Sequence, residues 1–499
     1  MQLTAILLIP AIASALSLSR PGRRFAAPIT LIASAIVLAL SASVAEDVAH
    51  GGHPDATGGW LTCDGLGGLV LLLVALVSFT AALFSWGYLE RGPRYSRRRL
   101  QRYYGLYNLF VLSMLAIPLL ANVALMWIAV ELTTLLSAFL VGFHDTPEAL
   151  EAAWKYVILT TLGAVIALLG FLILYWGSQV AGFEPFTWVG LVDASPRMPP
   201  ALLWPAFLLI LVGFGTKAGL VPMHTWLPDA HSQAPASICA LLSGVETTTA
   251  LYVILRLFPV IGFAPGLDAK PWFIGFGLLS AGVAALLLIR VRDFKRMFAF
   301  STVEHMGIIL VAAGLGGAEA HLGAAYQITG HAVAKSFCFF RRRHGRFGSR
   351  RPGYLKRAGP YPLLADRRSC LARGRVRDRG PLKSALIGFV QSTTIFPASG
   401  PQSLMTCSVT RQGVVSITTS VLCAASPGFR KVVPSIFLRG LYFGSAASGT
   451  PKTILCPLAA SLAPSAPPTL PAPIIPTFIE DSLYSLAGFA AGLALIAMI

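Results

Sequence analysis

Long apolar runs dominate the first 340 residues of this 499-residue chain. A helix needs about 20 mostly apolar residues to cross the hydrocarbon core of a bilayer. Pro118 and Asn122 divide one stretch of 39 residues, which is too long for a single span. The eleven runs then lie at 2–18, 25–45, 66–88, 105–121, 122–143, 156–176, 201–220, 236–259, 271–290, 298–315 and 322–340. This pattern predicts an all-α integral membrane protein, a polytopic bundle of about 11 helices.

Composition agrees with an integral membrane protein. The mean hydropathy is +0.70, and charged residues make up 12% of the chain, against about 25% in soluble proteins. The seven cysteines show no C-x-x-C spacing, and neither a dinucleotide fingerprint nor a phosphate loop is found, so we expect this chain to bind no cofactor. If the chain belongs to a redox complex, the redox centres should lie elsewhere in that complex.

The net charge of +18 is concentrated in one segment. Residues 341–380 contain thirteen arginines and one lysine against two aspartates, a net charge of +12, which leaves +6 for the other 459 residues. The basicity is therefore local, and we expect the lipid bilayer and other protein subunits as partners, with no nucleic acid.

Basic loops predict how the chain crosses the membrane. Clusters of arginine and lysine at 20–24, 91–102, 290–296 and 341–343 should all be cytoplasmic. Counting helices from an outside N-terminus places every one of them inside, and places the loop 46–64 outside. The first run resembles a signal peptide in its Ala-Ile-Ala sequence, but its arginines follow the apolar core. We therefore expect an uncleaved first helix in a bacterial-type inner membrane.

One lysine interrupts an apolar run. Lys217 follows the apolar stretch 201–212, and a charge at that depth costs about 2.5–3.5 kcal/mol by insertion scales. Three glycines and two prolines lie around it between residues 213 and 228, and such residues break membrane helices. The sequence predicts a discontinuous helix here, with Lys217 facing the protein interior or a path for water.

Other ionisable residues within the predicted helices are functional candidates. An opposite-charge pair keeps both groups ionised in a bilayer, and we expect Glu131 to form that pair with Lys217. A change in their separation would load and unload a proton. The further candidates are Lys155, Glu246, His331 and Lys335, of which the last two lie one turn apart on one helix face.

Simpler explanations stay open for these further candidates. Lys155 and Lys335 lie near helix ends, where long side chains reach the interface. His331 is alternatively a hydrogen-bonded packing residue, and Glu246 alternatively bonds to the threonines at 247–249.

Three polar residues follow the predicted break, namely His224, Asp229 and His231 around Pro228. One carboxylate and two histidines on a loop are a weak indication of a metal site. We favour a loop that lets water reach Lys217, with a structural turn as the alternative.

Several motifs resemble the proton-conducting, antiporter-like membrane subunits of respiratory complex I, the NADH-quinone oxidoreductase chain 5-like family. They are GTK at 215–217, PMHTWLPDAH at 222–231, AP at 234–235, ALLSG at 240–244, DFKRMFAFST at 293–302 and GHAVAKS at 330–336. LEAAWKY at 150–156 and EHMG at 304–307 are most similar to hydrogenase-4 component F. The resemblance covers residues 1 to about 340.

The resemblance implies a fold of about fourteen helices with two inverted repeats. It implies that Glu131 modulates Lys217, that Lys155 matches a lysine early in helix six, and that His331 and Lys335 form a central relay. Such a subunit has no redox site of its own; electron transfer in membrane and peripheral partner subunits drives proton movement through it. The chain would then be one subunit of a proton-translocating oxidoreductase of the NADH:quinone or hydrogenase type.

Two positions depart from the family pattern. Ser243 and Gln327 stand where the distal complex I subunits carry relay histidines, so the proton route must differ there. Two rival functions remain: a cation/proton antiporter subunit without redox coupling, and a non-pumping truncated product.

The sequence loses its membrane pattern after residue 340. Residues 1–120 form the expected N-terminal helices and 121–340 the conducting core, whereas 341–499 are first basic and then rich in serine and proline. This irregular part is either a basic tail that binds anionic lipid or a partner, or an out-of-frame translation. Retranslating the gene in the other two frames decides between them. Residues 483–499 are a marginal candidate for one more span.

Overall fold

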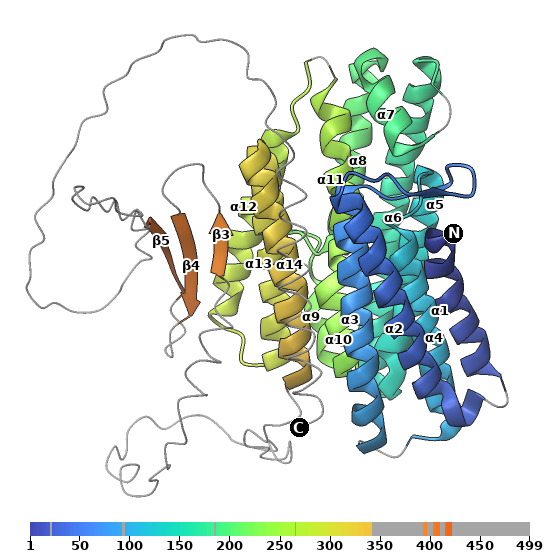
Figure 1. Ribbon diagram of the computed structural model, residues 1–499. Helices are drawn as coiled ribbons and strands as arrows, with labels where there is room; N and C mark the ends of the chain where they lie inside the picture. The colour runs from blue at the N-terminus through green and yellow to red at the C-terminus, as the bar shows by residue number, and fades with distance from the viewer. Residues whose placement is uncertain are drawn as a thin grey trace, which may run out of the picture.

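Membrane-length helices account for most of the described chain. The computed structural model describes residues 1–19, 22–91, 95–183, 186–264 and 266–341, together with the strands at 393–396, 403–409 and 415–421. The long helices run side by side in one bundle (Figure 1). They are α1 (Gln2–Leu18), α2 (Gly22–Ala49), α3 (Gly65–Arg91), α4 (Arg97–Ala116), α5 (Val123–Val141), α6 (Pro147–Val180), α8 (Pro200–Ala218), α11 (Thr247–Gly262), α12 (Lys270–Leu288), α13 (Phe294–Leu315) and α14 (Ala318–Arg341).

Each of the eleven predicted apolar runs lies on a helix of this bundle. Among the described residues, eight helical stretches are long and apolar enough to cross a membrane. Helix α1 has 17 residues, and α4 and α14 have a more polar composition. The prediction of an all-α, multi-pass membrane protein is confirmed.

Local sequence signals explain where several helices begin. The side chain of Asn122 accepts hydrogen bonds from the backbone amides of Ala124 and Leu125, and so caps α5 at the predicted division of the 39-residue stretch. Thr146 caps α6, with Pro147 at the first helical position. These caps set the residues at which α5 and α6 begin, and both helices carry site residues.

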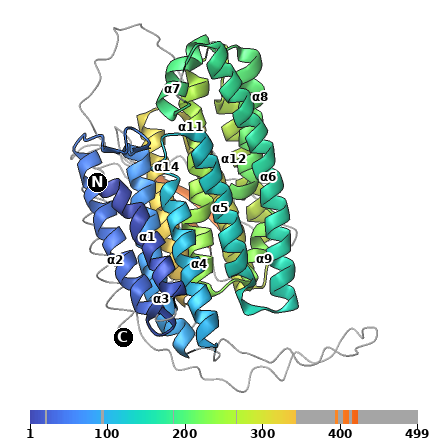
Figure 2. The ribbon, with the colours of Figure 1, turned by 90° about the vertical axis from the view of Figure 1, so that its right-hand side faces the viewer.

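Glycines bring α6 and α8 into close contact. A Cβ atom at Gly163 would lie 2.6 Å from the carbonyl oxygen of Gly213, and one at Gly213 would lie 2.5 Å from the amide nitrogen of Ala167. No side chain fits at either distance, so both positions require glycine. This close approach places the C-terminal turn of α8, which carries Lys217, directly beside α6 (Figure 2).

Helix α8 ends next to Lys217. Ala218 is its last residue, and Gly219 takes a positive φ of 80° that glycine adopts without strain. A non-helical segment follows, and then come α9 (Trp226–Gln233), α10 (Ala236–Leu241) and a π-helical segment (Leu242–Glu246) that continues into α11. That α8 and α9 are two halves of one discontinuous membrane helix stays a prediction.

The short elements lie at the bundle ends and in the tail. Helix α7 (Trp188–Ala194) lies at the upper end of the bundle in Figure 1, and a hairpin of β1 (Asp55–Ala56) and β2 (Leu61–Thr62) precedes α3. In the region expected to be irregular, β3 (Thr393–Phe396), β4 (Ser403–Val409) and β5 (Val415–Val421) form an antiparallel sheet in that order. The possible span at 483–499 lies outside the described residues.

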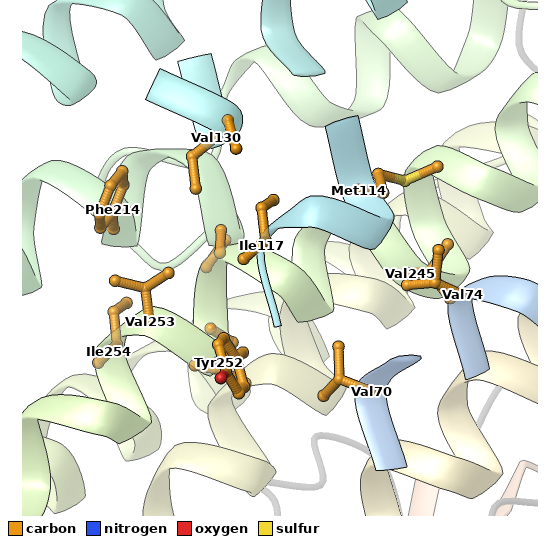
Figure 3. Packing of buried hydrophobic residues seen from close by; sticks show 14 of the residues in the cluster. Val70, Val74, Met114, Ile117, Val130, Phe214, Val245, Tyr252, Val253 and Ile254 are labelled. Atoms are coloured by element: carbon orange, nitrogen blue, oxygen red, sulfur yellow. The ribbon is translucent and has the colours of Figure 1, made fainter. Parts of the chain in front are cut away.

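A continuous apolar core joins the helices. Figure 3 shows part of this cluster, to which α3, α4, α5, α8 and α11 contribute the side chains of Val70, Met114, Val130, Phe214 and Ile254. Lys217, Glu246 and His331 are buried within the same bundle.

Candidate functional site

Lys217 forms a buried ion pair with Glu246. The Nζ atom of Lys217 lies 3.1 Å from Oε1 of Glu246, and each side chain is 1% exposed. Lys217 also donates a hydrogen bond to the hydroxyl of Thr134 on α5, and its Nζ lies 5.9 Å from the centroid of the Tyr156 ring. Burial of a charge is tolerated when it is paired and hydrogen-bonded, and here both conditions are met.

Two hydroxyl groups complete the environment of Glu246. The Tyr156 hydroxyl donates to Oε1 of Glu246 over 2.7 Å, and Ser137 Oγ lies 2.7 Å from the Tyr156 oxygen. Glu246 is the last residue of the π-helical segment, a local widening that is frequent at functional sites. Helices α5, α6, α8 and the π segment therefore converge on one carboxylate.

Glu246, and not Glu131, is the ion-pair partner of Lys217. Glu131 lies on α5 one turn before Thr134 and accepts a hydrogen bond of 2.8 Å from the hydroxyl of Thr161. The sequence could not show this, because both carboxylates lie within apolar helices and only the packing of α11 against α8 decides between them. Glu131 remains one helical turn from the threonine that Lys217 contacts.

The threonines beside Glu246 do not bond to its carboxylate. The hydroxyls of Thr247, Thr248 and Thr249 donate to the backbone carbonyls of Ser243, Gly244 and Glu246. The carboxylate is instead contacted by Lys217, Tyr156 and Ser137, which removes the simpler explanation that the sequence left open for Glu246.

A second polar cluster surrounds His331 on α14. Nε2 of His331 lies 2.7 Å from the carbonyl oxygen of Ser243 in the π segment. Lys335 is 4% exposed, and its Nζ lies 3.4 Å from the carbonyl oxygen of Phe298 on α13. Lys335 is therefore buried and does not reach the interface, contrary to one of the explanations open for it.

The two departures from the family pattern both have partners on α13. Gln327 Nε2 lies 2.6 Å from Nδ1 of His305, whose ring centroid is 5.1 Å from that of His331. Ser243 Oγ lies 2.6 Å from Oγ1 of Thr302. A histidine thus lies next to His331 after all, but α13 supplies it. The sequence signal was the EHMG motif, which contains this residue.

The site residues lie at one depth in the bundle. Tyr156 is nine residues after the start of α6, Glu246 ten after the start of α10, and His331 ten before the end of α14. At 1.5 Å per residue each is about 14–15 Å from the same end of the bundle, where α9 and α10 lie low in Figure 1. Glu131, ten residues before the end of α5, is at the same depth. The polar groups therefore form a layer across the bundle.

Several polar atoms of this layer have no protein partner. Within the described part of the chain, Oε2 of Glu131, Oε2 of Glu246 and Nδ1 of His331 are buried and have no hydrogen-bond partner. Buried polar groups are normally hydrogen-bonded to protein or to water. The layer thus offers positions where water can bind between the ionisable side chains.

Lys155 lies in a charged pocket at one end of the bundle. Its Nζ is 2.6 Å from Oε1 of Glu151 and 3.4 Å from Oδ2 of Asp229, which also pairs with Arg296 at 2.8 Å. The pocket has a volume of about 320 Å³ and is also lined by Glu148. Lys155 is thus a solvent-exposed residue one position before the buried Tyr156.

The residues expected on a loop after Lys217 are only partly on a loop. Asp229 and His231 lie on helix α9, because Pro228 occupies its first turn, where proline is tolerated. His231 is buried, and its Nδ1 lies 2.8 Å from the carbonyl oxygen of Leu227. His224 precedes the helix and is half-buried near Phe300. These three residues do not meet: the described residues include no group of three that could hold a metal ion.

Sequence reasoning missed Thr134, Ser137 and Tyr156. Hydroxyl-bearing residues are common in membrane helices, and the one signal for Tyr156 was its place at the end of the LEAAWKY motif. Thr134 and Ser137 are three and six residues after Glu131 on α5, and this helical spacing was the available signal for these two.

Comparison with known families decides the affiliation. Residues 121–348 match the family described as NADH:quinone oxidoreductase/Mrp antiporter, TM. This part of the chain is similar to that antiporter-like family. The predicted resemblance is confirmed.

Individual relatives of this antiporter-like chain include hydrogenase-4 components. The Hydrogenase-4 component F homolog of Methylacidiphilum infernorum (isolate V4) is 38% identical over 57% of this chain and 62% of the relative. Hydrogenase-4 component B of Escherichia coli (strain K12) is 30% identical over 56% of this chain and 42% of the relative. The chain therefore spans less than two thirds of the length of either relative.

Solved structures share the fold of this antiporter-like chain. A chain of the membrane-bound sulfane sulfur reductase, an archaeal respiratory membrane complex, matches with a TM-score of 0.61 at 23% identity, over 68% of this chain and 70% of that chain. A chain of respiratory complex I from Thermus thermophilus matches with a TM-score of 0.55 at 22% identity, over 68% and 69%. Both are chains of multisubunit membrane complexes.

Proposed function

We propose that this chain is the membrane subunit of a hydrogenase-4-like or complex-I-like redox complex and conducts protons through a half-channel centred on Lys217. The observation that carries this proposal is the buried Lys217–Glu246 ion pair within the antiporter-like fold. Lysine and glutamate both exchange protons, and a buried pair favours their charged forms. Separation of the two groups removes that preference, which releases or takes up a proton.

The polar layer supplies the onward route in this proposal. From Lys217 and Glu246 the ionisable groups continue to His331, His305 and Lys335 at similar depth, with Glu131 on the other side. Water between them completes the connection. Glu131 then modulates Lys217 from one helical turn beyond Thr134, and the pocket around Lys155 and Asp229 provides access from the aqueous phase.

The driving force in this proposal comes from partner subunits. Electron transfer through iron–sulfur, Ni-Fe or quinone centres in those subunits changes the conformation of the membrane part. The chain lies in a bacterial inner membrane with its N-terminus outside, as the basic loops predict. The relative named Hydrogenase-4 component F homolog favours this redox-coupled function.

Cation/proton antiport without redox coupling is the second candidate function. A probable K(+)/H(+) antiporter protein of Rhizobium meliloti (strain 1021) is 30% identical over 56% of this chain and 27% of that relative. Neighbouring genes distinguish the two candidates: hydrogenase and iron–sulfur subunits for the first, a set of small antiporter subunits for the second.

Proton uptake by reconstituted protein tests the proposal. The full chain is placed in liposomes that contain a pH-sensitive dye, and a potassium diffusion potential drives proton entry. Lys217→Ala should reduce uptake to the leak of protein-free liposomes, whereas Lys270→Ala, at the exposed start of α12, should not change it. Uptake by Lys217→Ala at the wild-type rate contradicts the proposal.

A further inference from the structure

We propose that Tyr156 is the gate through which protons pass between the charged pocket and the Lys217–Glu246 pair. This inference rests on the proposed function and adds the entry route to it. The charged pocket is the cavity of about 320 Å³ lined by Glu148, Glu151, Lys155, Asp229 and Arg296, among others.

The charged pocket is suited to collecting protons. Three carboxylates and two cationic side chains line it. Lys155 forms ion pairs with Glu151 and Asp229, and Arg296 forms an ion pair with Asp229. Glu148, in the first turn of α6, is exposed. Carboxylates at the mouth of a path exchange protons with bulk water and raise their local concentration.

Two buried aromatic rings lie one helical turn beyond residues that line the charged pocket. Ala152 lines it, and Tyr156 lies one turn further along α6 on the same face. Asp229 also lines it, and Trp226 lies one turn deeper on α9. The rings of Tyr156 and Trp226 pack with centroids 4.7 Å apart, and both side chains are buried. Both helices thus place an aromatic ring directly behind a pocket-lining residue.

Trp226 is held in place, whereas Tyr156 reaches into the site. The indole Nε1 of Trp226 donates to the carbonyl oxygen of Thr216, next to Lys217, over 2.7 Å. The Tyr156 hydroxyl donates to Oε1 of Glu246 over 2.7 Å. The Tyr156 side chain therefore packs against Trp226, and its oxygen contacts the buried pair.

The proton transfer balances without a charged tyrosine. When water from the charged pocket reaches the Tyr156 oxygen, a protonated water gives a proton to that oxygen as the hydroxyl proton moves to Oε1 of Glu246. The phenol is neutral before and after, the carboxylate becomes a carboxylic acid, and one proton has entered. With the ring in its resting position against Trp226, the path is closed.

Two substitutions of Tyr156 distinguish a gate from a structural role. Tyr156→Phe keeps the ring and removes the oxygen, so the path stays closed and has no relay; uptake should fall on the order of 100-fold, as for loss of a proton-transferring group. Tyr156→Ala removes the ring as well, and a polar cavity of that size admits water. Uptake by Tyr156→Ala should therefore exceed that by Tyr156→Phe. If Tyr156→Ala does not fold, Tyr156→Ser is used in its place.

The measurement is proton uptake into liposomes, with Tyr175→Phe on the same helix as the matched control. A structural role predicts the reverse order, because the larger deletion disturbs packing more than the smaller one. Proton uptake by Tyr156→Phe at the wild-type rate contradicts the gate, and so does slower uptake by Tyr156→Ala than by Tyr156→Phe. In either case, loss of uptake in Lys217→Ala leaves the proposed function intact. Unchanged uptake in Lys217→Ala removes the proposed function itself.

Discussion

Lys217 on α8 and Glu246 at the end of the π segment lie 3.1 Å apart between Nζ and Oε1, and both side chains are 1% exposed. The pair joins two helices that enter the bundle from opposite ends. It also sets the roles of the neighbours: Thr134 solvates the cation, and Tyr156 solvates the carboxylate. A change at either charged residue should therefore alter the environment of the other.

Neutralising Glu246 should destabilise the fold. Glu246→Gln leaves Lys217 as a buried charge without a counter-charge, and breaking a buried pair in this way costs about 3–5 kcal/mol. Thermal unfolding of the purified protein in detergent measures the effect. Asp193→Asn, at an exposed position on α7, is the control and should leave the unfolding temperature unchanged. An equal temperature for both variants would show that the pair is not formed.

Neutralising Glu131 should affect stability much less than neutralising Glu246. Glu131→Gln keeps an oxygen that can accept the hydrogen bond from Thr161, so we expect a loss of no more than about 1 kcal/mol. Proton uptake should nevertheless decrease, because the charge near Lys217 is lost. A large fall in the unfolding temperature would place Glu131 in the ion pair that the structure assigns to Glu246.

Added volume at the α6–α8 contact should displace Lys217. Gly213→Ala puts a methyl group 2.5 Å from the amide nitrogen of Ala167, and overpacking costs about 1–3 kcal/mol. Gly282→Ala on α12 is the matched control, since nothing lies within 4 Å of its added methyl group. The control should stabilise the protein by about 0.5–1 kcal/mol, as is usual for glycine within a helix. The opposite order of unfolding temperatures contradicts the described packing.

Loss of His305 should interrupt the route beyond the ion pair. His305→Leu removes a hydrogen-bond partner of Gln327 and the ring next to His331, at a cost of about 1–3 kcal/mol for the polar group left behind. Proton uptake should fall while the Lys217–Glu246 pair persists. His321→Leu, at an exposed position on α14, is the control. Unchanged uptake in His305→Leu would mean that the route does not use this histidine.

The sequence predicted the helices well because length and hydropathy alone decide which segments can cross a bilayer. Lys217 was also predictable, since a charge in an apolar run has few explanations. The partner of Lys217 was not, because Glu131 and Glu246 look alike along the chain and differ only in which helix faces α8. Tyr156 was missed for a similar reason: an aromatic residue in an apolar helix gives no sign of the carboxylate it contacts.

Helix α9 shows another limit of sequence-based prediction. Pro228 suggested a loop, yet it occupies the first turn of a helix, where its missing amide is not needed. The substitutions at Ser243 and Gln327 looked like gaps in a relay. The structure gives both a partner on α13, and only the packing of α13 against the π segment and against α14 reveals these contacts.

A double substitution of the ion pair tests the central claim most directly. Lys217→Met combined with Glu246→Gln removes both charges together, so the buried pair is replaced without leaving an unpaired charge, and stability should return close to that of the wild type. If Lys217 carries the proton, uptake by the double variant in liposomes stays at the level of the leak despite the restored stability. Uptake at the wild-type rate would contradict the account, since the pair would then serve only the fold.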